Sequence, residues 1–178
     1  MIFSNGKGKY TKSNGTIYEG EFYMNSFHGH GTHTNSNVGV YIGNFKSGFS
    51  HGKGKFTWSD GTIYDGNWVD GRRIGKGRTI YPSGSSFEGE FSGNSFHGHS
   101  THTNSNGEVY IGNFKNGVSH GKGKFTWSDG TIYEGDWVDG KRTRKGQMIY
   151  PSGASFEGDF YRNSCHGHNA LINSNRDV

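Results

Sequence analysis

The string YIGNFKSGFSHGKGKFTWSDGTI occupies residues 41–63, and an almost identical string, YIGNFKNGVSHGKGKFTWSDGTI, occupies residues 110–132. The two copies begin 69 residues apart, and each opens with an aromatic residue two positions before a glycine. This pair recurs every 23 residues, with its aromatic member at Tyr18, Tyr41, Tyr64, Phe87, Tyr110, Tyr133 and Phe156. Self-similarity at a fixed period of this length is typical of repeat proteins. The sequence therefore predicts a tandem array of 23-residue units that are grouped in threes.

The period also sets the expected organisation of the chain. Residues 1–17 match the second half of a unit and are interpreted as a partial N-terminal repeat. Seven units then fill residues 18–178 as one continuous repeat domain. Their expected bounds are 18–40, 41–63, 64–86, 87–109, 110–132, 133–155 and 156–178.

Each unit divides into two segments that alternate like β-strands. In the first segment of the second unit, Tyr41, Gly43 and Phe45 fall on one face. In the second segment, Phe56 and Trp58 share a face in the same way. Ser-Gly, Asn-Gly or Asp-Gly pairs separate the two segments in most units, and such pairs favour tight hairpin turns. The predicted unit is a β-hairpin.

The pattern resembles a known family, the MORN repeat (membrane occupation and recognition nexus). The stretches YEGDWVDG at residues 133–140 and SHGKGKFTWSDGTIYEGDW at 119–137 carry the resemblance most closely, and it extends from about residue 5 to 175. It implies an all-β fold, an elongated, single-layer, twisted antiparallel sheet of stacked hairpins. It also implies functions known in the family, which are mostly scaffolding, dimerisation and membrane association.

Composition limits the cellular setting. Only 29% of the 178 residues are hydrophobic, mean hydropathy is −0.86, and no apolar run approaches the roughly 18 residues of a membrane-spanning helix. The N-terminal sequence lacks the apolar segment of a signal peptide. The single cysteine, Cys165, excludes an intramolecular disulfide framework. We expect a cytoplasmic protein, located peripherally at a membrane if it binds lipid.

The aromatic face of the hairpins is the candidate protein-binding surface. The chain offers no second layer to cover this face, and exposed apolar patches usually mark an interaction site. The function we expect is a scaffold or protein-interaction module, with self-association, for example as a homodimer, as one form of it. The candidate residues are Tyr41, Phe45, Phe56, Trp58, Tyr64, Trp68, Tyr110, Phe114, Phe125, Trp127, Tyr133 and Trp137.

The opposite face carries charge and supports an alternative function. Acidic residues recur in the first strands and basic residues in the second, so hairpin pairing sets opposite charges side by side. One interpretation is a solvated face; the alternative is a peripheral module that binds anionic phospholipids such as phosphoinositides. The candidate lipid-binding residues are Lys53, Lys55, Lys76, Arg78, Lys122 and Lys124. The acidic rows argue against nucleic acid as a partner.

Metal binding and catalysis are not expected. In HGHGTH at residues 28–33, strand alternation sends His28 and His30 to one face and His33 to the other, so three ligands do not converge. The GKGK motif lacks the following Ser or Thr and the strand-to-helix context of a phosphate-binding loop. We therefore expect no enzymatic activity, no catalytic residues, no metal site and no cofactor.

Overall fold

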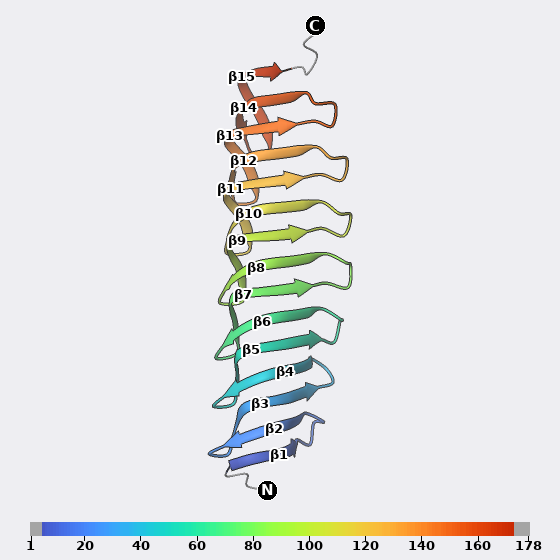
Figure 1. Cartoon of the computed structure of the whole chain (residues 1–178), viewed down its shortest axis with the longest axis vertical. Helices are drawn as coiled ribbons and strands as arrows, with labels where there is room; N and C mark the ends of the chain where they lie inside the picture. Colours follow the sequence, from blue (N-terminus) through green and yellow to red (C-terminus); the bar gives the residue numbers. More distant parts are fainter. Residues whose placement is uncertain (1–4, 173–178) are drawn as a thin grey trace. The chain divides into compact units, whose positions relative to one another are not determined.

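The computed structural model describes the backbone of residues 5–172 and the side chains of residues 5–166, and every regular element among them is a β-strand (Figure 1). The ends of the two terminal repeats, residues 1–4 and 173–178, lie outside the described residues. The strands are β1 (Asn5–Thr11), β2 (Ile17–Tyr23), β3 (Ser26–Asn35), β4 (Gly39–Lys46), β5 (Phe49–Trp58), β6 (Ile63–Val69), β7 (Arg72–Ile80), β8 (Ser86–Ser92), β9 (Ser95–Thr103), β10 (Val109–Lys115), β11 (Val118–Thr126), β12 (Ile132–Val138), β13 (Lys141–Ile149), β14 (Ser155–Tyr161) and β15 (Ser164–Ile172).

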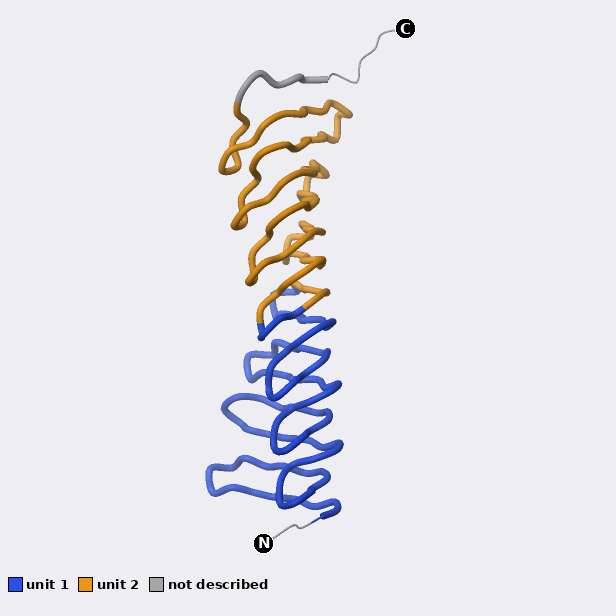
Figure 2. The backbone as a smooth tube through the Cα atoms, turned by 90° about the vertical axis from the view of Figure 1, so that its left-hand side faces the viewer, with its two compact units in different colours: residues 1–84, 91–94 blue, residues 85–90, 95–178 orange. Residues whose placement is uncertain are grey.

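The strands form one open antiparallel sheet of 15 strands, in which sheet order follows chain order. The predicted all-β sheet of tandem hairpins is thus confirmed. Backbone contacts divide the sheet into two compact units, coloured separately in Figure 2. Unit 1 comprises residues 1–84 and 91–94, and unit 2 comprises residues 85–90 and 95–178.

A two-residue turn closes each hairpin. Ser47 and Gly48, between β4 and β5, have φ angles of 49° and 87°, and Asp70 and Gly71 have 48° and 76°. Two successive positive φ values define a type I′ turn, whose twist matches the right-handed twist of the strands. The Gly48 N–H also donates to the Phe27 carbonyl of the preceding hairpin at 2.9 Å. The predicted tight turns are present, and they also link consecutive hairpins.

Each hairpin contains a bulge that its alternating pattern does not reveal. Between β4 and β5, Gly43 pairs with Gly54 and Phe45 pairs with Ser50, so the second strand has two more residues than the first. Gly52 lies inside this bulge with a φ of +66°, which L-residues with side chains rarely adopt. The bulge preserves the alternation of faces, so Ser50 points to the same face as Phe45 and Gly54.

The core is a row of aromatic rings that lie flat on glycine pairs. Tyr41 is 2% exposed, and its phenol covers the paired glycines Gly43 and Gly54. A Cβ atom at Gly54 would overlap the Tyr41 phenol, and one at Gly43 would lie 2.7 Å from the hydroxyl oxygen. The glycines are therefore required by the ring above them. Tyr18, Tyr64, Tyr110 and Tyr133 cover glycine pairs in the same way.

The tyrosine hydroxyl completes this arrangement by bonding to its own strand. The Tyr41 hydroxyl donates to the Asn44 carbonyl at 3.0 Å, and the Tyr133 hydroxyl donates to the Asp136 carbonyl at 3.0 Å. Burial raises the pKa of Tyr41 to about 12. It does the same for Tyr18, Tyr64, Tyr110 and Tyr133.

In the fourth hairpin the core tyrosine and one glycine of the pair beneath it are both replaced. Its ring is Phe87, and a serine, Ser100, replaces the second glycine of the pair. The Ser100 hydroxyl donates to the His97 carbonyl at 3.2 Å and accepts from the Glu90 N–H at 3.1 Å. Ser100 therefore supplies the hydroxyl that Phe87 lacks, in the space that a tyrosine hydroxyl would need.

Neighbouring hairpins are joined by edge-to-face ring contacts. The Tyr18 ring meets the Phe22 ring of its own hairpin at 5.1 Å and the Phe45 ring of the next hairpin at 5.0 Å, with interplanar angles of 88° in both cases. Such aromatic pairs contribute about 0.5–1.5 kcal/mol beyond the area they bury. The sheet thus has a continuous apolar layer within each unit without a second sheet.

We expect the natural pair Phe87 and Ser100 to be transferable to the second hairpin. Gly54→Ser alone should lower the free energy of unfolding by about 3 kcal/mol because its side chain overlaps the Tyr41 phenol. Adding Tyr41→Phe should recover about 1–3 kcal/mol of that loss in a urea-denaturation double-mutant cycle. Gly48→Ser, at a turn with open space around it, is the matched control and should show no coupling to Tyr41→Phe. Additive effects at Gly54 would contradict the ring-on-glycine account.

We expect the protein to unfold between about pH 10 and 12. Burial raises the pKa of each of the five buried tyrosines to about 12, from an ordinary value of 10.0. Above pH 10 the unfolded chain therefore releases tyrosine protons first, and stability falls as pH rises towards 12. The ultraviolet absorbance of tyrosinate from these five residues should rise over the same pH range in which the native circular dichroism signal is lost. Their ionisation in a chain that keeps its native circular dichroism would refute this expectation.

Candidate functional site

The twelve predicted aromatic residues differ in how much surface they present. Eight of them lie in the core, each no more than 8% exposed: Tyr41, Phe45, Tyr64, Trp68, Tyr110, Phe114, Tyr133 and Trp137. The other four, Phe56, Trp58, Phe125 and Trp127, are half-buried. The first three lie in the second strands of hairpins two and five, and Trp127 directly follows its strand. These four carry most of the accessible ring surface among the twelve.

A further row of side chains decides how much of the core layer stays open. It lies nine residues after each core ring and consists, in the first six hairpins, of Phe27, Ser50, Arg73, Phe96, Ser119 and Arg142; we call it the cover row. Its residue type repeats every third hairpin, in step with the 69-residue period. The row was not singled out by sequence, although a column that reads Phe, Ser, Arg, Phe, Ser, Arg is visible in an alignment of the repeats.

Phenylalanines in the cover row lie flat over the core. The Phe27 ring stacks on Tyr18 with centroids 3.8 Å apart and an interplanar angle of 11°. Phe96 stacks on Phe87 at 3.6 Å and 18°. Each phenylalanine therefore closes the apolar layer above its own hairpin.

Arginines in the cover row sit in cages of rings. The Arg73 guanidinium carbon lies 5.7 Å from the Trp58 ring, 5.5 Å from Tyr64 and 5.4 Å from Phe91. Nη2 of Arg73 donates to the Asn94 carbonyl at 2.7 Å, and the Arg73 backbone N–H donates to Asn94 Oδ1 at 2.8 Å. Burial lowers the pKa of Arg73 from its ordinary value. Cation–π contacts and these hydrogen bonds hold the guanidinium in place.

Serines in the cover row leave space above the core ring, and a tryptophan of the next hairpin fills part of it. Above Tyr41, Ser50 fills little space, and the larger Trp68 of the next hairpin takes part of it, at 5.3 Å and 88° from the Tyr41 ring. Trp68 is fixed there because its Nε1 donates to the Gly54 carbonyl at 2.9 Å. A small cover residue is thus matched by a tryptophan where other hairpins have phenylalanine.

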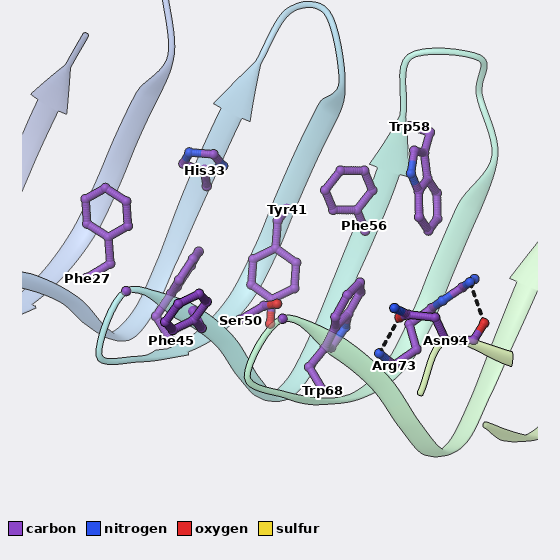
Figure 3. Close-up of a pocket in the computed structure, with 13 residues that line it drawn as sticks. Phe27, His33, Tyr41, Phe45, Ser50, Phe56, Trp58, Trp68, Arg73 and Asn94 are labelled. Atoms are coloured by element: carbon purple, nitrogen blue, oxygen red, sulfur yellow. Dashed lines mark hydrogen bonds between the residues drawn. The ribbon is translucent and has the colours of Figure 1, made fainter. Parts of the chain in front are cut away.

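An open groove of about 490 Å³ results at Ser50, between Phe27 on one side and Arg73 on the other (Figure 3). Tyr41, Phe45 and Trp68 also line it. The remaining lining residues are His33, Gly48, Phe49, Phe56, Trp58, Gly71 and Asn94. Figure 3 places Phe56 and Trp58 along one wall and Arg73, with its bonds to Asn94, at one end.

The 69-residue period gives unit 2 the same ring and guanidinium contacts around Ser119, from which we infer a second groove. The Trp137 ring lies 5.1 Å from Tyr110, and its Nε1 donates to the Gly123 carbonyl at 3.0 Å. The Arg142 guanidinium carbon lies 5.2 Å from the Trp127 ring. Nη2 of Arg142 donates to the Asn163 carbonyl at 2.9 Å.

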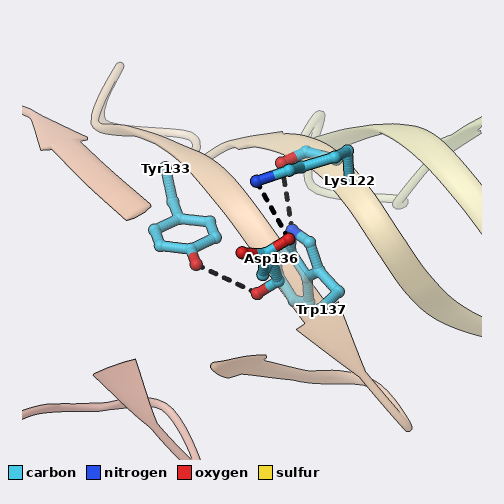
Figure 4. Close-up of polar contacts among 5 residues, drawn as sticks. Lys122, Tyr133, Asp136 and Trp137 are labelled. Atoms are coloured by element: carbon cyan, nitrogen blue, oxygen red, sulfur yellow. Dashed lines mark hydrogen bonds and ion pairs between the residues drawn. The ribbon is translucent and has the colours of Figure 1, made fainter. Parts of the chain in front are cut away.

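The predicted lipid-binding side chains lie on the charged face next to acidic residues. Lys122 forms an ion pair with Asp136 at 3.0 Å, while the Asp136 carbonyl accepts the Tyr133 hydroxyl (Figure 4). Lys9 also forms an ion pair with the residue directly opposite it on the neighbouring strand, Glu19, at 3.5 Å. All six candidates are exposed: Lys53, Lys55, Lys76, Arg78, Lys122 and Lys124. Four of them lie directly opposite a carboxylate residue on a neighbouring strand, namely Lys55 and Arg78 opposite Asp65, Lys122 opposite Asp136 and Lys124 opposite Glu134, whereas Lys53 lies opposite Asn67.

The histidines do not form a metal cluster within residues 5–166. No group of three His, Cys, Asp or Glu side chains with ligand geometry occurs in this part of the chain. His51 Nδ1 lies 3.5 Å from the Asp70 carboxylate of the next turn, and His120 Nδ1 lies 3.6 Å from Asp139. His33, in the groove wall, is half-buried. Desolvation by burial lowers its pKa, and the nearby positive charge of Lys12 lowers it further.

The fold and the groove define an open-sheet β-hairpin repeat protein. The sequence model of the MORN repeat matches residues 3–17, 18–37, 41–63, 64–86, 87–109, 110–132 and 133–155. The chain belongs to the MORN repeat family. No curated protein matches it. No helix in the described chain is long and apolar enough to cross a membrane.

Three solved structures have folds that resemble this chain over most of its length, at low sequence identity. One is the SAS-4 (dCPAP) TCP domain of Drosophila melanogaster in complex with a proline-rich motif of Ana2, at 14% identity, with 93% of this chain and 88% of that chain covered and a TM-score of 0.44. Another is the Danio rerio CPAP TCP10 domain with a STIL peptide, at 12% identity, 86% and 84% coverage and a TM-score of 0.29. A third is a CPAP G-box domain, at 14% identity, 94% and 98% coverage and a TM-score of 0.28. At such low identities and TM-scores these likenesses carry no argument about what this chain binds.

Proposed function

We propose that this chain is a non-catalytic protein-interaction module that binds a segment of a partner protein in the groove at Ser50 and in its counterpart at Ser119. The observation that carries this proposal is the gap in the cover row. Where Phe27 and Arg73 close the layer, Ser50 leaves rings of Phe56, Trp58 and Trp68 bordering an open groove.

The composition of the groove supports binding. Aromatic residues and arginine are enriched where proteins contact one another, and they supply most of the binding energy at such contacts. The volume of about 490 Å³ falls within the roughly 300–1,000 Å³ typical of ligand sites. No carboxylate or thiol of residues 5–166 lines the groove.

The groove is also rigid, which favours binding. Its rings stand on paired strands and not on loops, and hydrogen bonds hold Trp68 to Gly54 and Arg73 to Asn94. A site whose side chains are already ordered loses little conformational entropy when a ligand arrives.

Self-association is a competing use of the same sheet. Within the described residues β1 lies at one edge of the sheet, where another copy could pair with it, but β1 carries Lys7 and Lys9 between glycines. Lysines on an edge strand discourage pairing between sheets. We therefore favour a different protein as the partner.

We expect a peptide-display selection on the intact protein to yield ligands that need the grooves. Ser50→Phe with Trp68→Phe should fill the first groove from within, because it copies the Phe27 and Phe45 combination of the first hairpin, and Ser119→Phe with Trp137→Phe should fill the second. Selected peptides should bind the wild type and lose at least tenfold in affinity with both grooves filled. Circular dichroism melting of the filled variant is the control for folding. Peptides that bind the folded, filled variant equally well would refute the proposal.

We expect no binding to anionic vesicles at physiological salt, because four of the six basic candidates lie opposite a carboxylate residue on a neighbouring strand. Flotation with phosphatidylcholine vesicles, with and without phosphoinositide, at low and physiological salt tests this. The matched variant is Lys53→Glu with Lys55→Glu. Binding that requires the anionic lipid, weakens with salt and disappears in that variant would instead favour the peripheral membrane function.

A further inference from the structure

The groove at Ser50 combines aromatic rings with a guanidinium, and together these groups indicate which kind of ligand it binds. The inference rests on the proposed function, since it specifies what the same grooves bind. One wall is formed by rings, and one end is formed by the Arg73 guanidinium.

Two contacts within the sheet show that a phenyl ring packs well on its apolar layer. At the neighbouring hairpin, the phenyl ring of Phe27 lies parallel to Tyr18 at 3.8 Å. In the fourth hairpin, Phe96 repeats this contact on Phe87 at 3.6 Å. The space next to Ser50 is bordered by rings of the same kind, so an aromatic side chain from outside would extend a contact that the chain already makes twice.

A guanidinium is the other group that the cover row uses, but the groove disfavours a second one. Arg73 already places its positive charge at the groove end, 5.7 Å from the Trp58 ring. Like charges at such distances repel in a partly desolvated site. The phenyl ring is therefore the better fit.

Arg73 adds a demand for negative charge. Among the described residues its guanidinium donates one hydrogen bond, from Nη2 to the neutral Asn94 carbonyl, and it lies over three ring faces. No carboxylate lines the groove within residues 5–166, and His33 is the other ionisable base in the lining. A carboxylate is the group that pairs best with a partly buried guanidinium.

We propose that each groove binds an aromatic side chain of an extended partner segment that also carries a carboxylate beside that ring. In the first groove the ring lies against Phe56 and Trp58, and the carboxylate lies against Arg73. The chain then binds two such segments, since Tyr110, Trp137 and Arg142 repeat the arrangement at Ser119.

The two grooves are not identical, and their differences predict which one binds the ligand more tightly. Arg142 also donates from Nη1 to the sulfur of Met148 at 3.3 Å. At the rim, the exposed Phe49 of the first groove is replaced by Val118 in the second. The first groove therefore offers a less engaged guanidinium and a larger apolar rim, and it should bind the more tightly of the two.

Tryptophan provides a direct readout of both sites. The chain has four tryptophans, and all of them belong to the grooves: Trp58 and Trp68 line the first, and Trp127 and Trp137 occupy the equivalent positions of the second. The four indole N–H signals in a nitrogen-15 spectrum, together with the intrinsic fluorescence, report binding at each groove separately.

The test uses blocked peptides in which an Asp-Phe pair is flanked by Gly and Ser, titrated into the full chain. The expected result is saturable shifts of all four indole signals at two peptides per chain. Replacing Asp by Asn should weaken binding about tenfold, and replacing Phe by Ala should abolish it. A peptide with Arg in place of Phe is the competing ligand and should bind more weakly.

Arg73→Gln supplies the matched protein variant. It should remove the advantage of the Asp peptide over the Asn peptide at Trp58 and Trp68 but leave that advantage at Trp127 and Trp137. Because the comparison is between two peptides on the same variant, a modest loss of stability does not mimic it. Arg142→Gln should give the reciprocal result.

The outcomes separate this inference from the proposed function. Equal binding of the Asp and Asn peptides, tighter binding of the Arg peptide, or shifts confined to residues outside the grooves would overturn the inference. If the Asp-Phe peptide does not bind while display-selected peptides do bind and are lost on filling the grooves, the inference fails and the proposed function stands. If display-selected peptides also bind regardless of groove filling, both fail.

Discussion

The structure depends on the contact between a tyrosine ring and a pair of glycines that face each other across two strands. Tyr41 lies flat on Gly43 and Gly54, and its hydroxyl bonds to the carbonyl three residues further along its own strand. A single hairpin cannot bury such a ring, because the glycines cover one side only. The other side is covered by rings of the same and the next hairpin, which makes each repeat dependent on its neighbour. A single-layer sheet can therefore have a core at all.

This dependence explains how repeats of one design acquire different surfaces. The ring and the glycines are constrained by their close approach, and even the departure at Phe87 is matched by Ser100. The cover row is not constrained in that way, so it can vary between phenyl, hydroxymethyl and guanidinium groups. Where it varies, its neighbour at the next hairpin follows, as Trp68 does opposite Ser50. The structure is set by one column of the repeat, and the binding specificity that we propose would be set by another.

Much of this could be predicted from the sequence, and the rest was missed for physical reasons. The alternation of Tyr41, Gly43 and Phe45 gave the strand and its inward face, and the Ser47–Gly48 pair gave the turn. The bulge around Gly52 leaves the alternation unchanged, so periodicity cannot reveal it. The burial of Tyr64 and Trp137 under neighbouring rings was missed because it depends on how flat a tyrosine lies, which is a property of packing. Ser50 drew no attention because a small polar residue matters here through the space it leaves.

The groove at Ser50 extends from Phe27 of the first hairpin to Asn94 in the turn of the fourth, nearly the length of the 69-residue period. No single repeat contains a site, and no pair of repeats does. Gain or loss of one 23-residue unit would put the wrong side chains beside each serine, whereas gain or loss of a whole triplet would add or remove one complete site. The valency of such a chain can thus change in integer steps through in-frame duplication of three repeats, while the sites already present keep their sequence.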